Sequence, residues 1–70
     1  MMPLALAEMD DANIIRKVTG NPQQRKHLED MGFVVGANVT VVSALGGNLI
    51  VKVKESRIAI SREMAGKIMV

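Results

Sequence analysis

The chain has 70 residues, of which 49% are hydrophobic and 23% are charged, and its net charge is +2. These proportions favour one small globular domain spanning residues 1–70 and exclude a disordered segment. The absence of cysteine excludes disulfides, thiolate catalysis and cysteine-based zinc or iron–sulfur sites, so a reducing cytoplasm is the expected compartment. The N-terminus has no basic segment before its short apolar run, which argues against a signal peptide.

The first predicted elements are a strand over Ala12–Val18 and a short helix over Pro22–Met31. Asn21 can cap the helix, since its side chain accepts hydrogen bonds from the first free amides. Gln24, three residues later, completes the pattern of a capping box. The helix therefore has a clear start signal in the sequence.

Apolar residues at the end of this helix predict how it packs. Leu28 and Met31 lie three residues apart, on one helix face. Gly32 follows the last turn and can adopt the left-handed conformation that ends many helices. We therefore expect Phe33, the only aromatic residue of the chain, to fold back into the core.

An uncharged stretch of 21 residues, Met31–Val51, is long enough to cross a bilayer as a helix. However, glycine and asparagine residues divide the stretch, and its apolar residues are mostly β-branched, which favours strands. The sequence therefore predicts a turn at 32–38, a strand over Val39–Leu45, a tight turn over Gly46–Asn48 and a second strand from Leu49, rather than a membrane helix.

The second strand of this stretch alternates between apolar and basic residues. Leu49, Val51 and Val53 are one set, while Lys52 and Lys54 belong to the other. This period is typical of a strand with one buried and one solvated face.

A third strand is predicted around Ile58 and Ile60, after a break at Glu55–Ser56. Ser61 can cap one helical turn, and a closing strand follows at Lys67–Met69. Successive strands joined by short turns predict an antiparallel meander, and a meander that closes is a small β-barrel with one short helix inserted before it.

The order of these elements resembles the FeoA-like family, small cytoplasmic accessory proteins of ferrous iron uptake. The residues that match its Leu-x-x-Leu-Gly-Leu-x-x-Gly element are Leu28, Met31, Gly32, Phe33 and Gly36. The strands "NVTVVSAL" and "GGNLIVKVK" and the ending "SRIAISREMAGKIMV" follow in the family's order, and "PLALAEM" matches its leading apolar strand. Met9-Asp10-Asp11 departs from the family, which usually has a Pro-Gly-type turn there.

The resemblance implies an SH3-like barrel and a partner, the membrane ferrous iron transporter with its cytoplasmic GTPase region. The chain would then reach the membrane only through this partner, with no cofactor of its own. The same domain also forms the C-terminal module of metal-dependent transcriptional regulators, so a stand-alone relative of that module is an alternative. Weak self-association into a homo-oligomer is a further expectation.

Catalytic and metal-binding patterns are weak in this chain. The single histidine has no nucleophile pattern beside it, and Gly46-Gly47 lacks the Lys-Ser/Thr of a phosphate-binding loop, so no enzymatic activity is expected. His27 and Asp30 lie three apart on the predicted helix and are weak metal candidates, because a site needs three or four ligands.

Binding of nucleic acid is the main alternative function. Five basic residues are predicted to line one solvated sheet face: Arg16, Lys17, Lys52, Lys54 and Arg57. Proteins that bind single strands also stack bases on aromatic side chains. Phe33 is expected in the core, so no binding to DNA or RNA is expected.

A protein-interaction module is the remaining function class. Leu45, beside Gly46 and Gly47, is an apolar residue at a turn, where it either docks on a partner or folds back onto the core. The basic residues Lys52, Lys54 and Arg57 are further candidates for partner contact.

Overall fold

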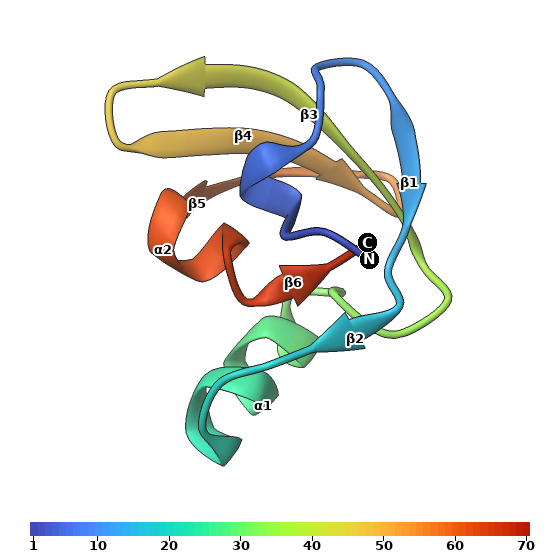
Figure 1. The fold of residues 1–70 in the computed structure, drawn as a ribbon, viewed down its shortest axis with the longest axis vertical. Helices are drawn as coiled ribbons and strands as arrows, with labels where there is room; N and C mark the ends of the chain where they lie inside the picture. Colours follow the sequence, from blue (N-terminus) through green and yellow to red (C-terminus); the bar gives the residue numbers. More distant parts are fainter.

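The computed structural model describes residues 1–70 and is mostly β, with two short helices (Figure 1). The elements in chain order are η1 (a 3₁₀ turn, Leu4–Leu6), β1 (Ala12–Ile14), β2 (Lys17–Val18), α1 (Pro22–Asp30), β3 (Asn38–Leu45), β4 (Asn48–Val53), β5 (Ser56–Ser61), α2 (Arg62–Ala65) and β6 (Ile68–Met69).

The strands form two antiparallel sheets. The larger sheet has the order β1-β3-β4-β5, and the smaller one pairs β2 with β6. Two-residue turns join β3 to β4 and β4 to β5, which confirms the predicted meander. The chain ends lie side by side in Figure 1, where Met2 and Val70 exchange two backbone hydrogen bonds of 2.8 Å.

The uncharged stretch folds as the meander rather than as a helix. It supplies the turn after α1, all of β3, and β4 as far as Val51. None of the helices is long and apolar enough to cross a membrane.

The predicted single strand over Ala12–Val18 is wrong, because the chain changes sheets at Ile15–Arg16. β1 pairs with β3, whereas β2 pairs with β6. Between them, the Ile15 amide donates to the Ala37 carbonyl, and the Arg16 amide donates to the Met69 carbonyl. This corner turns the buried Ile15 side chain into the core and leaves its neighbour Ile14 about half exposed.

The predicted leading strand through Leu4 and Leu6 is also wrong. The amides of Leu6 and Ala7 donate to the carbonyls of Pro3 and Leu4, which closes the 3₁₀ turn η1. In a strand, residues two apart would share one face. In the structure, Leu4 is fully buried while Leu6 is 71% exposed.

The start of α1 is capped as predicted. The Asn21 side chain accepts a hydrogen bond of 2.8 Å from the Gln24 amide, and the Gln24 side chain accepts one of 3.0 Å from the Asn21 amide. This reciprocal pair satisfies two amides that have no partner within the helix.

The end of α1 forms a Schellman motif, with the helix ending at Asp30 and Met31 as its cap. Gly32 has a φ of +104°, which confirms the predicted left-handed conformation. The Gly32 amide donates to the Glu29 carbonyl at 2.9 Å, and the Phe33 amide donates to the Leu28 carbonyl at 3.0 Å. The turn therefore folds Phe33 back against Leu28.

The core is entirely apolar, and no polar or charged residue is buried. It confirms the prediction for Leu28 and Phe33, both fully buried, while Met31 packs against it from the side. The buried residues are Leu4, Ile15, Leu28, Phe33, Val39, Val41, Leu49, Val51, Val53, Ile60, Ala65, Ile68 and Val70. Gly36 lies outside this core, with a φ of +91° and its amide donating to the Ile15 carbonyl.

Candidate interaction surface

The tip of the β3–β4 hairpin carries an exposed apolar side chain. Leu45 pairs with Asn48 across the turn, and Gly46 takes a φ of +61° between them. The Leu45 side chain is 75% exposed, so it does not fold back onto the core. The predicted hairpin turn at Gly46-Gly47 is confirmed.

The hairpin tip is tied to α2 rather than free. The Arg62 amide, at the start of α2, donates a hydrogen bond of 3.0 Å to the Gly47 carbonyl. The other end of α2 is held as well, since Gly66 and Lys67 alone separate it from β6. Leu45 is therefore presented on a turn whose backbone is fixed, which lowers the entropy lost when a partner covers it.

A second exposed leucine lies on an element beside α2. Leu6 belongs to η1, and η1 packs against α2, as does the end of the sheet that carries the hairpin tip. This exposure could not be predicted from the sequence, because a strand would have placed Leu4 and Leu6 on the same face.

The predicted basic residues do not share one face. Lys52 and Arg57 stand directly opposite each other on β4 and β5, and both are exposed. Arg16 and Lys17 lie beyond the corner, at the second sheet, so the predicted common face with them is wrong.

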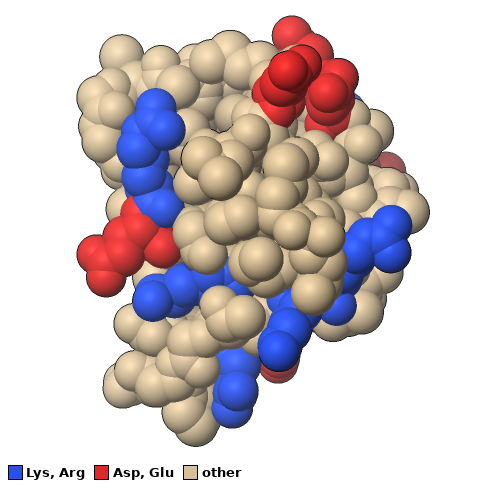
Figure 2. Space-filling view, viewed as in Figure 1, with Lys and Arg blue, Asp and Glu red and all other residues tan.

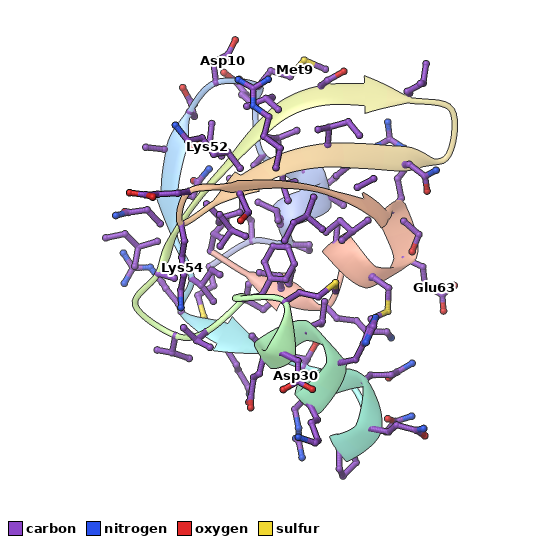
Figure 3. The ribbon with its side chains drawn as sticks, turned by 180° about the vertical axis from the view of Figure 1, so that it is seen from behind. Met9, Asp10, Asp30, Lys52, Lys54 and Glu63 are labelled. Carbon is purple, nitrogen blue, oxygen red and sulfur yellow. The ribbon has the colours of Figure 1, made fainter.

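Lys54 is separated from Lys52 and Arg57 by its position in the β4–β5 turn. It adopts a φ of +55°, and its side-chain carbons pass the Gly32 backbone. Figure 3 shows the side chain running from the turn toward α1. The basic candidates therefore comprise one cross-strand pair and one exposed lysine beside the turn after α1, rather than a continuous row.

Charges of both signs are spread over the surface. Figure 2 shows acidic side chains gathered over the loop before β1 and further acidic atoms at the left edge, with basic side chains spread over the left, lower and right parts of that face. The only ion pair joins the Lys26 and Asp30 side chains of α1, at 3.7 Å. Lys52 and Arg57 consequently lack any acidic partner within the chain.

The metal candidates His27 and Asp30 both lie on the exposed surface of α1. Asp30 already pairs with Lys26, and no group of three histidine, cysteine, aspartate or glutamate side chains is close enough to hold a metal ion. The structure also contains no pocket for a small molecule.

Comparison with known proteins agrees with this fold. The family model for the FeoA domain matches residues 2–70. A protein of Methanocaldococcus jannaschii assigned as an Fe(2+) transport protein A is 36% identical over 70 residues, which cover all of this chain and 85% of that protein. This chain belongs to the FeoA family. The family comprises accessory proteins of ferrous iron transport.

Solved structures place the FeoA fold among SH3-like barrels, which confirms the predicted fold class. The Stenotrophomonas maltophilia FeoA, solved with zinc and described as an SH3 domain protein, superposes with a TM-score of 0.86 at 24% identity, over 99% of this chain and 88% of that one. A manganese-dependent transcriptional repressor superposes with a TM-score of 0.85 at 14% identity, over 94% of this chain and 38% of the repressor. At these identities the likeness concerns the fold alone.

Proposed function

We propose that this FeoA-family chain is a non-enzymatic, cytoplasmic accessory protein that binds the cytoplasmic GTPase region of the membrane ferrous iron transporter. The observation that carries the proposal is Leu45, 75% exposed at the tip of a hairpin whose backbone is fixed by α2. A partner that covered this leucine would remove its apolar surface from water, which favours binding.

The basic pair Lys52 and Arg57 supports contact with an acidic surface on the partner. Like charges directly opposite each other on adjacent strands destabilise a sheet by some tenths of a kcal/mol up to about 1 kcal/mol. An acidic group of the partner would relieve this repulsion. Such rim contacts contribute more to the rate of association than to affinity.

Binding of nucleic acid is less well supported. The basic residues are divided between two sheets, and Phe33, the one aromatic residue, is fully buried. No aromatic side chain is left on the surface to stack with bases. The third candidate, a stand-alone relative of the C-terminal domain of metal-dependent regulators, is supported by the shared fold alone.

The test is a calorimetric titration of the chain against the transporter's GTPase region and, separately, against mixed RNA, at low and high salt. We expect binding to the GTPase region that falls only a few-fold with salt, because apolar contact dominates it. Changing Lys52, Lys54 and Arg57 together to Ser should slow association and leave most of the affinity. Tight RNA binding with a steep salt dependence, and none to the GTPase region, would overturn the proposal.

A further inference from the structure

The outer edge of β5 is a free strand edge. β5 is the last strand of the larger sheet and pairs only with β4. Figure 3 shows it at the rim of that sheet. Closed barrels have no such edge, whereas here the second sheet is built from β2 and β6 alone.

The hairpin geometry shows which backbone groups of β5 point outward. The two-residue turn at Lys54–Glu55 makes Val53 and Ser56 a hydrogen-bonded pair, and such pairs recur at every second residue. The hydrogen bond from the Arg62 amide to the Gly47 carbonyl fits this alternation.

The residues between the bonded pairs, Arg57, Ala59 and Ser61, therefore direct their amides away from β4. None of these three amides donates to a backbone carbonyl in the loops, caps or other elements. The carbonyls of Arg57 and Ala59 point outward in the same way.

The edge has few of the features that usually prevent strands from pairing. β5 is six residues long, contains no proline or lysine, and has a regular register along its whole length with β4. At its centre is Ala59, an exposed residue whose side chain is too small to obstruct an approaching strand. A free and regular edge is a template for another strand.

The sequence of β5 is complementary to itself in one antiparallel register. When Ala59 meets Ala59 of a second copy at a two-fold axis, Arg57 stands opposite Ser61, so the two arginines do not face each other. On the inner face, Ile58 stands opposite Ile60 of the second copy. Ile58 is only partly buried in the single chain, so this pairing would cover its remaining apolar surface.

From the free edge and this register, we infer that β5 pairs with β5 of a second copy of the chain, forming a symmetric dimer whose sheet continues across both molecules. The pairing uses the Ala59 amide and carbonyl of each copy and the Ser61 amides against the Arg57 carbonyls. Because few hydrogen bonds and little apolar area are involved, the dimer is weak and forms at high concentration. The hairpin tip with Leu45 lies outside this interface, so the inference is independent of the proposed function.

Because the chain contains no cysteine, a single introduced thiol reports on one position only. In Ala59→Cys, two thiols meet at the two-fold axis, with the Cα atoms about 5.5 Å apart, as in hydrogen-bonded antiparallel pairs. This separation suits a disulfide. The matched control is Leu45→Cys, which is also exposed but stands on β3, two strands in from the free edge of β5. In a glutathione redox buffer, we expect the Ala59→Cys chain to form disulfide dimer at least tenfold faster than the control.

Sedimentation equilibrium of the wild-type chain and of Ala59→Pro completes the test. The proline removes an outward amide without breaking the β4–β5 ladder, so the variant folds, and we expect its self-association to be lost. Persistence of the wild-type dimer in Ala59→Pro would overturn the inference, as would equal cross-linking of the two cysteine variants. Protection of the Ala59 amide from hydrogen exchange only when the transporter's GTPase region is added would likewise exclude a second copy as the occupant.

Discussion

In two turns of this molecule, a large apolar residue lies beside a left-handed glycine. The apolar side chain is buried in one turn and exposed in the other. At the end of α1, Gly32 turns Phe33 inward until it is fully buried. At the tip of the β3–β4 hairpin, Gly46 closes the turn and Leu45 stays 75% exposed. The same local chemistry therefore serves the core in one place and the surface in the other.

The difference arises from what each turn can reach. The Schellman motif points Phe33 at Leu28, one helical turn back, and at the inner face of the sheet. The hairpin tip extends past the end of the core, and its Gly47 carbonyl accepts a hydrogen bond from the start of α2. We conclude that the first turn stabilises the fold, whereas the second is available to a partner. Each prediction below alters one side of this comparison.

The largest effect is expected at the α1 turn. Phe33→Ala should lower the free energy of unfolding by about 3–5 kcal/mol, and Leu28→Ala by about 2–5 kcal/mol, because both leave a cavity in the core. A domain of this size has so thin a margin that either change could unfold it. Thermal or urea unfolding measures both. Stabilities close to wild type would show that the turn does not build the core.

Gly32 should be the next most sensitive position. Gly32→Val forces a β-branched residue to a φ of +104°, so we expect a loss of at least about 1–2 kcal/mol. No clash contributes, since a Cβ there would lie 3.8 Å from its nearest neighbours. Gly47→Val is the control, because Gly47 has no positive φ and nothing within 4 Å. Equal losses in the two variants would contradict a conformational role for Gly32.

Substitutions at the two residues of the β4–β5 turn should change the free energy of unfolding by smaller amounts, with opposite signs. Lys54 holds a φ of +55° without being glycine, so Lys54→Gly should raise the free energy of unfolding by about 1 kcal/mol. Glu55, its neighbour, has no positive φ, so Glu55→Gly should lower the free energy of unfolding by about 0.5–1 kcal/mol. Urea unfolding of the pair gives the comparison, and the same sign for both would refute it.

Most of the meander could be predicted from the sequence. The alternation of Leu49, Val51 and Val53 with polar residues indicates a strand with one buried and one solvated face. The cap at Asn21 and the left-handed conformation of Gly32 could also be predicted, since each depends on neighbouring residues in the sequence. These signals lie within a few residues of the structure that they specify.

The features of the fold that the sequence did not predict depend on contacts between residues distant in the sequence. The corner at Ile15–Arg16 is set by hydrogen bonds to Ala37 and Met69, and two adjacent isoleucines give no sign of it. Asp10 takes a φ of +67° where the family usually has a Pro-Gly-type turn, held by a hydrogen bond from its amide to the Val41 carbonyl.

Only part of the candidate interaction surface could be predicted from the sequence. The sequence located Leu45 at a turn, but its exposure depends on where the core ends. The separation of Lys17 from Lys52 likewise depends on which sheet each strand joins. Both facts belong to the tertiary structure.

The most direct test of the central claim compares Leu45→Asp with Val35→Asp, a second exposed apolar loop residue, at 67% exposure. Both variants should unfold within about 0.5 kcal/mol of wild type, as surface changes do. Titrated against the transporter's GTPase region, Leu45→Asp should lose about 30-fold or more in affinity, as a central anchor would, while Val35→Asp stays near wild type. Equal affinity in both variants, or a Leu45→Asp chain that fails to fold, would contradict the assignment of Leu45 to binding rather than stability.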